Sequence, residues 1–241
     1  MTLAGKTILI TGAARRIGQS LAIAMAKAGA DVILHHGSSP EEARQTAVLI
    51  EQLGRRAWVL PADLSHLEAV EGLIEKANHL SPLFAIVNNA AIFESLPLPE
   101  TSLATWQRAM DINLTAPFLL SRDFARQLPS GSQGKIVNIL DWRALRPGPD
   151  HFAYTISKAA LAAMTQSMAV ALAPRITVNG LALGAILPPS DGGNTSEVIQ
   201  QVPAARWARL EEVAEALQFL LDGPDYITGE ILYLDGGRHL V

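Results

Sequence analysis

A tyrosine and a lysine stand four residues apart in the segment FAYTISKAALAAM, at Tyr154 and Lys158. The segment is predicted to be helical, and this spacing puts both side chains on one face, one turn apart. A lysine ammonium near a phenol favours the phenolate, so we expect the pKa of Tyr154 to be lowered toward acid–base chemistry. Neither of the other two tyrosines has a lysine at this distance. The pair therefore predicts a proton-transfer site on this helix.

Asp141 precedes Tyr154 by thirteen residues and follows the apolar segment GKIVNIL. An ionised carboxylate only accepts hydrogen bonds, whereas a protonated one also donates. Partial burial at the end of a strand should raise the pKa of Asp141 and let it act as an acid. The alternative is that Asp141 caps a turn before Trp142.

The segment Thr11-Gly-Ala-Ala-Arg-Arg-Ile-Gly18 joins a short apolar segment to one of helical composition. Gly12 permits a tight turn, and Gly18 lets the helix pack close to the sheet. The start of such a helix offers free N–H groups to a pyrophosphate. Arg15 and Arg16 add positive charge at the same place. This turn predicts a nucleotide-binding site.

Apolar segments typical of buried strands alternate with segments of helical composition along the whole chain. The predicted strands are 6–12, 31–36, 57–63, 83–91, 134–140, 175–183 and 229–237, and the predicted helices are 17–30, 40–54, 66–79, 101–128, 152–174 and 211–222. This alternation predicts an α/β fold, a Rossmann-type doubly wound parallel sheet of about seven strands with helices on both faces. We expect one domain spanning 1–241. Ligands bind such sheets at the carboxyl ends of the strands.

The segment 185–205 contains Pro188-Pro-Ser-Asp-Gly-Gly193 and is predicted to be a mobile lid over the substrate. The alternative is a surface excursion without a function.

Composition limits the classes of function. The 241 residues carry a net charge of −4, which does not suggest a nucleic-acid surface, and no run of about 18 apolar residues predicts a membrane span. The chain has no cysteine, which excludes disulfides and thiolate metal sites and favours a cytoplasmic protein. His35 and His36 are neighbours on a strand and point to opposite faces, so we predict no metal site.

Five motifs occur in the order and spacing of the short-chain dehydrogenase/reductase family. They are TGxxxxIG at 11–18, NNAA at 88–91, Asn113, the Tyr154-x-x-x-Lys158 pair, and Leu-Asp-Gly-Gly at 234–237. The chain resembles this family over essentially its whole length. The resemblance implies NAD(P)-dependent hydride transfer and a homotetramer formed through helices 101–128 and 152–174. It also implies that Asn113 holds a break in its helix and a water that connects to Lys158. The alternative is a solvated polar residue.

Departures from the family pattern point to a narrower group. Arg16 stands where the family has a glycine, and Asp141 where it usually has a serine. With Phe93 just after NNAA and Gly-Gly-Arg-His-Leu near the end, they are similar to the pteridine reductases and dihydromonapterin reductases. That resemblance implies reduction of a C=N bond in a dihydropterin or dihydrofolate-like ring. Arg16 and Phe93 would bind the ring, and Asp141 or Tyr154 would supply a proton. For Phe93, the alternative is an ordinary core position.

Two other functions stay open. A 3-oxoacyl reductase or another ketone reductase would keep the fold and the cofactor, and Asp141 argues against it. A nucleotide-binding regulator that has lost catalysis is the second, and the intact pair of Tyr154 and Lys158 argues against that.

The predicted cofactor is NADPH. NAD-specific proteins of this fold usually place an acid after the second strand, and none follows 31–36 here. Arg15, Ser38 and Ser39 would suit a 2′-phosphate instead. Asp63 would contact adenine beside the N–H of Leu64, or else cap the next helix. By the resemblance, the cofactor is expected to contact Gly12, Arg15, Arg16, Ile17, Gly18, His36, Ser38, Ser39, Asp63, Leu64, Asn89, Ala90, Ala91, Tyr154, Lys158, Gly184 and Ile186.

Overall fold

Seven parallel strands form one sheet in the computed structural model, which describes residues 3–188 and 195–241. Their order is β3-β2-β1-β4-β5-β6-β7, so the chain winds outward in both directions from β1 and β4. The strands are β1 (Thr7–Ile10), β2 (Asp31–His36), β3 (Ala57–Pro61), β4 (Ala85–Asn88), β5 (Gly134–Asp141), β6 (Ile176–Leu183) and β7 (Ile231–Leu234). The predicted doubly wound fold is confirmed.

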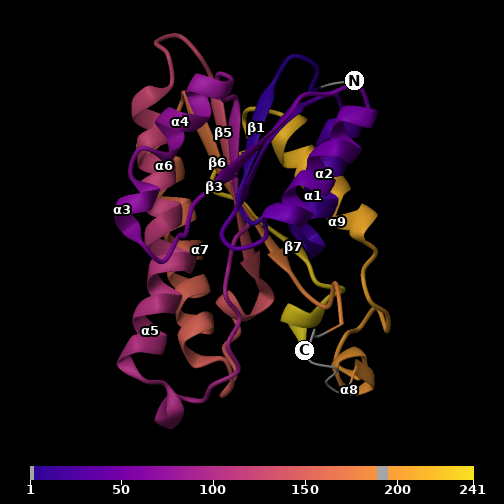
Figure 1. Ribbon diagram of the computed structural model, residues 1–241. Coiled ribbons are helices and arrows are strands. Elements are labelled where there is room, and N and C mark those ends of the chain that lie inside the picture. Colours follow the sequence, from indigo (N-terminus) through magenta and orange to yellow (C-terminus); the bar gives the residue numbers. More distant parts are fainter. Residues whose placement is uncertain (1–2, 189–194) are drawn as a thin grey trace.

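Helices cover both faces of the sheet (Figure 1). The helices are α1 (Arg16–Lys27), α2 (Pro40–Gln52), α3 (Leu67–Val70), α4 (Leu73–Leu80), α5 (Leu103–Met110), α6 (Ala116–Gln127), α7 (Phe152–Leu172), α8 (Thr195–Gln200) and α9 (Leu210–Asp222). In Figure 1, α1, α2 and α9 lie on one side of the sheet and α3 to α7 on the other. Each side of the sheet has its own apolar core, because the central strands β1 and β4 are buried on both faces.

Two predicted helices differ from the structure. The helix expected over 66–79 is two helices, because Gly72 takes a left-handed conformation with φ 80° between α3 and α4. The helix expected over 101–128 is continuous in space but passes through a π-helical turn at Asp111–Thr115. Pro117 has no N–H to donate to the carbonyl of Asn113 four residues earlier, which interrupts the α-helical pattern at this point.

The segment predicted to be a lid, 185–205, contains a helix that the sequence did not predict, α8. Part of the lid, 189–194, lies outside the described residues. The last strand is shorter than expected, since β7 covers Ile231–Leu234 rather than 229–237. Among the described residues, no helix is long and apolar enough to cross a membrane.

Candidate active site

The glycine turn between β1 and α1 is fixed to the end of β4. Thr11 Oγ1 accepts hydrogen bonds from the backbone N–H groups of Asn89 and Ala90, both at 2.9 Å, and Asn89 Nδ2 donates to the Thr11 carbonyl at 2.8 Å. A Cβ on Gly18 would lie 2.1 Å from the Gly12 carbonyl oxygen, and Gly12 has φ 64°. Both positions therefore require glycine. No acidic residue occupies the first turn of α1, which leaves its N-terminus suited to a phosphate.

His35 accepts a hydrogen bond from the glycine turn, a role that was not predicted from the sequence. The backbone N–H of Gly12 donates to His35 Nδ1 at 3.2 Å, and His35 Nε2 lies 3.0 Å from the Ala62 carbonyl oxygen. Burial lowers the pKa of His35 to about 4, so the ring is neutral near pH 7. His35 joins three strand ends through hydrogen bonds.

The residues predicted to bind a 2′-phosphate lie at the ends of β1 and β2. Arg15 is exposed, and its guanidinium is 4.0 Å from the Glu42 carboxylate of α2. Ser38 is exposed, whereas His36 and Ser39 are buried. An Arg15 side chain held this loosely is free to turn toward an anion at the end of β2.

Arg16 connects the glycine turn to the segment after β6. Its backbone has φ 52°, an uncommon conformation for a residue with a side chain. Arg16 Nη2 donates to the Pro188 carbonyl at 3.0 Å. Arg16, which is expected to contact both cofactor and substrate, is thus bonded to the segment predicted to be a lid.

Asp63 forms a local turn after β3. Its Oδ1 accepts from the backbone N–H of Ser65 at 2.9 Å and from Ser65 Oγ at 2.7 Å. The alternative that it caps the next helix is wrong, because α3 begins at Leu67 with His66 at the cap position. Leu64 is buried.

Asp141 and Tyr154 are in direct contact at the end of β5. The Tyr154 hydroxyl donates to Asp141 Oδ2 at 3.0 Å, and the other oxygen, Oδ1, accepts from the backbone N–H of Arg143 at 2.9 Å. Burial raises the pKa of Asp141, which confirms that part of the prediction. Asp141 therefore caps the following turn and also contacts the tyrosine, and its role as an acid stays a prediction.

The predicted lowering of the Tyr154 pKa is wrong in this arrangement. Burial and the negative charge of Asp141 raise the pKa of Tyr154 well above its usual value. Lys158 Nζ is 5.8 Å from the centre of the tyrosine ring and donates instead to the Ile139 carbonyl at 2.7 Å. Burial lowers the pKa of Lys158 to about 8. Tyr154 is thus held as a protonated donor beside a carboxylate.

Asn113 lies fully buried in the π-helical turn. Its Oδ1 accepts from the Ile92 N–H at 2.9 Å, and its Nδ2 donates to the Ile92 carbonyl and to Ser157 Oγ at 3.1 and 3.0 Å. The alternative of a solvated side chain is wrong. Asn113 connects the segment after β4 to α7 one residue before Lys158, and its link to Lys158 through water stays a prediction.

Phe93 lies beside the tyrosine rather than in the core. Its side chain is 55% exposed, which rules out the core alternative. One ring face stacks on His151, with centroids 3.9 Å apart, and the ring meets Tyr154 edge-on at 4.6 Å. No motif in the sequence pointed to His151, which caps the start of α7 with φ 50°. It supports an exposed aromatic ring next to the reacting groups.

The remaining predicted contacts lie at the ends of β1, β4 and β6. A Cβ on Gly184 would lie 2.6 Å from Asp235 Cα, so the chain passes close to the segment after β7. Ile186 is buried in the core, and its contact with the cofactor stays a prediction. Ile17 and Ala90 are partly buried, and Ala91 is exposed.

Together these groups define a Rossmann-type oxidoreductase site: a glycine turn at the point where the strand order reverses, next to a Tyr–Lys pair at the strand ends. A family model described as enoyl-(acyl carrier protein) reductase matches residues 12–239. A short-chain type dehydrogenase/reductase of Picea abies is 32% identical, over 98% of this chain and 93% of its own. The chain belongs to the short-chain dehydrogenase/reductase family.

Relatives of known name differ in substrate. The chain is 32% identical to a 3-oxoacyl-[acyl-carrier-protein] reductase of Synechocystis, over 98% of this chain and 97% of that one. Among solved structures, it is similar to FolM alternative dihydrofolate reductase 1 from Brucella canis complexed with NADP, with TM-score 0.92 and 35% identity over 100% of this chain and 97% of that one. It is also similar to a blue fluorescent protein from a metagenomic library in complex with NADPH, with TM-score 0.91 and 34% identity over 99% of each chain.

Proposed function

We propose that this protein reduces the C=N bond of a dihydropterin or dihydrofolate-like ring with NADPH. The observation that carries the proposal is the partly buried Asp141, in contact with Tyr154 where a ketone reductase of the family usually has a serine. A ring nitrogen must receive a proton when the adjacent carbon receives hydride. A carboxyl group whose pKa is raised by burial is suited to give that proton.

The cofactor is NADP(H), in line with the solved relatives that hold it. The residues of this chain fit it: the first turn of α1 carries no acidic residue that would repel a phosphate, and no acid directly follows β2. Arg15, Ser38 and Ser39 would hold the 2′-phosphate, and Lys158 the ribose hydroxyls. When bound, the cofactor supplies the hydride.

The chain's own residues bind the ring and move the proton. The ring of Phe93 is 55% exposed although it stacks on His151, so it offers a surface for a flat substrate. Arg16 would bind the same substrate from the glycine turn. Asp141 or Tyr154 would deliver the proton to the ring nitrogen. The proposal is supported by the position of Phe93, Asp141 and Tyr154, which lie at the same end of the sheet as the glycine turn with Arg16.

A ketone reductase is the second candidate, favoured by the 3-oxoacyl reductase among the relatives. The experiment compares kcat/KM for dihydropterins, dihydrofolate and acetoacetyl thioesters under NADPH oxidation. Preference for the thioester would contradict the proposal. A matched series with NADH tests the cofactor, and equal kcat/KM for NADPH and NADH would contradict the assignment of the 2′-phosphate site.

A single variant distinguishes the proposed enzyme from a nucleotide-binding regulator without catalysis. Tyr154→Phe removes the hydroxyl that donates to Asp141 and should abolish turnover while NADPH still binds. Retained turnover would remove Tyr154 from the mechanism.

We further propose that segment 185–205 acts as a substrate lid and that the protein is a homotetramer. Its cytoplasmic location stays a prediction.

A further inference from the structure

A cavity of about 680 Å³ is lined by Trp142, the residue after Asp141, and has no part in the steps described above. Its volume falls within the range of small-molecule sites. Its apolar wall comes from Trp142, Pro147, Pro203 and Val241. Trp142 directly follows Asp141, so a substrate whose reacting end lies at Asp141 can extend into this space.

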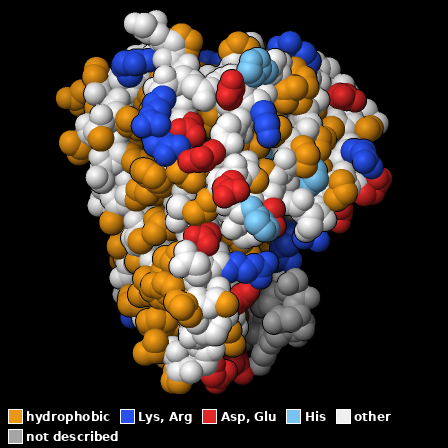
Figure 2. All heavy atoms as spheres, turned by 60° about the vertical axis from the view of Figure 1, so that its left-hand side comes forward, with side chains coloured by type: hydrophobic (Ala, Val, Ile, Leu, Met, Phe, Trp, Pro, Cys, Tyr) orange, Lys and Arg blue, Asp and Glu red, His pale blue; other side chains and the backbone are white. Residues whose placement is uncertain are grey.

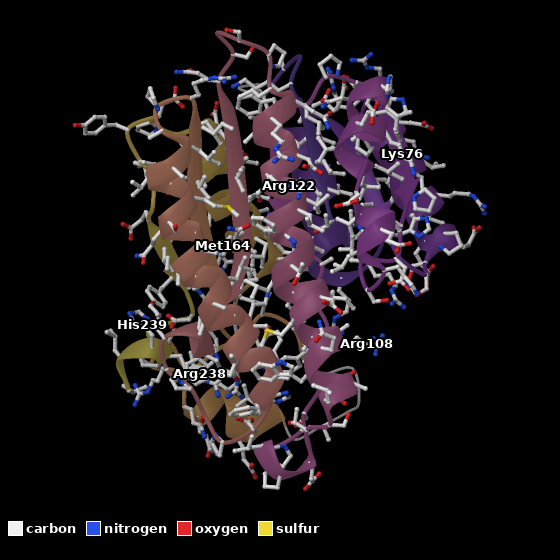
Figure 3. All side chains as sticks on the ribbon, turned by 90° about the vertical axis from the view of Figure 1, so that its left-hand side faces the viewer. Lys76, Arg108, Arg122, Met164, Arg238 and His239 are labelled. Atoms are coloured by element: carbon white, nitrogen blue, oxygen red, sulfur yellow. The ribbon has the colours of Figure 1, made fainter. Side chains whose placement is uncertain are left out.

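Two arginines give the cavity its charge. Arg238 is 8% exposed, and its guanidinium lies 4.2 Å from the centre of the Trp142 ring. Arg146 also lines the cavity, and its Nη1 donates to the His239 carbonyl oxygen at 3.4 Å. Figure 3 shows Arg238 and His239 side by side at the end of the molecule where α7 begins. Both guanidinium groups line the same cavity.

Neither arginine has an acidic partner among the described residues. No carboxylate of 3–188 or 195–241, the chain end included, lies within 4.0 Å of Arg146 or Arg238. Asp235, the acid nearest in sequence, is bound by His239 at 2.8 Å. Arg238 Nη2 donates to Gln201, but its buried Nε has no acceptor. Burial lowers the pKa of Arg238, and the more distant carboxylates of Asp141, Asp150 and Asp235 do not offset this, so an anion placed here would stabilise the guanidinium.

We propose that this cavity is a subsite for a substrate arm with an apolar or aromatic body and a carboxylate at its end. The arm would lie along Trp142 and the two prolines, and its carboxylate would pair with Arg146 and Arg238. This rests on the proposed function and narrows it: among dihydropterins, the subsite selects those with an aminobenzoyl-glutamate arm over those with a neutral hydroxylated side chain.

The first test is a ratio of activities, the kcat/KM for dihydrofolate divided by that for dihydrobiopterin. Arg146→Gln should lower this ratio about tenfold, because one charge-assisted hydrogen bond to the carboxylate is lost. Arg238→Gln should lower it at least as much. Arg44→Gln, an exposed arginine of α2 that pairs only with Glu41, is the matched control and should leave the ratio unchanged. An unchanged ratio in Arg146→Gln would overturn the proposal, whether or not Arg238→Gln folds.

The second test does not require turnover. The NADP complex is titrated with 4-aminobenzoyl-L-glutamate and with neutral 4-aminobenzamide, by calorimetry. The glutamate fragment should bind more tightly, and Arg146→Gln should remove the difference. Equal binding of both fragments by the unaltered protein would overturn the subsite. If no dihydropterin is reduced but the fragment still binds through Arg146, then the proposed function fails and the anion subsite stands.

Discussion

Asp141 shows how one side chain can serve structure and chemistry together. Its Oδ1 is fixed by the Arg143 N–H, which leaves Oδ2 directed at the Tyr154 hydroxyl. A carboxylate presents a separate oxygen to each of these two donors, whereas a serine would have to meet both with one oxygen. The fixed cap therefore holds the acid in position without the tyrosine. In the proposed function, this dual use separates the site from that of a ketone reductase.

Replacing this carboxyl should affect chemistry more than cofactor binding. We expect Asp141→Ser to lower kcat/KM for a dihydropterin by about 10²-fold or more, the range for losing a general acid, while the Kd of NADPH changes less than about twofold. Serine can still cap the turn, so the fold should persist. Asp222→Ser, at the end of α9, is a matched control and should retain activity. Equal losses of activity and NADPH affinity in Asp141→Ser would contradict a role in proton transfer.

Lys158 should make cofactor binding depend on pH. Burial lowers its pKa from 10.5 to about 8, so the ammonium is present below pH 8 and is lost as pH rises through that value. If the ammonium holds the ribose hydroxyls, the Kd of NADPH should increase above about pH 8. Arginine keeps its charge throughout this range, so Lys158→Arg should abolish the alkaline change. The same change in the arginine variant would assign it to another group.

At the scale of elements, the sequence predicted which strands carry the site because parallel strands end at one edge. Tyr154 and Lys158 were found from local spacing alone. The stacking of His151 on Phe93 and the contact of His35 with Gly12 join residues far apart in the chain, and no local pattern encodes them. The break in helix 101–128 at Asn113 was expected from the family resemblance alone, and its π-helical form was not predicted.

His35 gives the strand ends a pH dependence that can be measured. The unfolded state has a histidine pKa of 6.5 and the folded state about 4, so between these values only the unfolded state takes up the proton. Stability should therefore fall as pH falls from 6.5 toward 4, by on the order of 2 kcal/mol at pH 5. His35→Gln keeps an acceptor and a donor without titrating, and its urea-unfolding free energy should fall less over this range.

The control for this measurement is His79→Gln, at an exposed position in α4. It should leave the pH dependence of unfolding as it is in the unaltered protein. The contribution assigned to His35 would be contradicted if His35→Gln and the unaltered protein lost equal stability between pH 6.5 and 5. This comparison isolates one histidine, since the other acids and bases titrate alike in each variant.

At the scale of the molecule, the surface is divided. Figure 2 shows hydrophobic side chains gathered at the left and lower part of the face, whereas charged side chains are more frequent at the upper right. The exposed large hydrophobic residues include Phe118 of α6 and Val170 of α7, with exposed fractions of 43% and 84%. Apolar side chains that are this exposed on two long helices are typical of surfaces that pair with another copy.

The expected homotetramer can be tested on α7. The unaltered protein should have a mass near four times 25.8 kDa by light scattering after size exclusion. Val170→Asp puts a charge where we expect an apolar contact across a two-fold axis, and it should reduce the mass to that of a smaller assembly. Val48→Asp is the matched control: it makes the same change at a 50% exposed valine of α2, on the opposite side of the sheet, and should leave the mass unchanged. If Val170→Asp also left a tetramer, α7 would lie outside the interface. A monomeric unaltered protein would show that the site is complete within one chain.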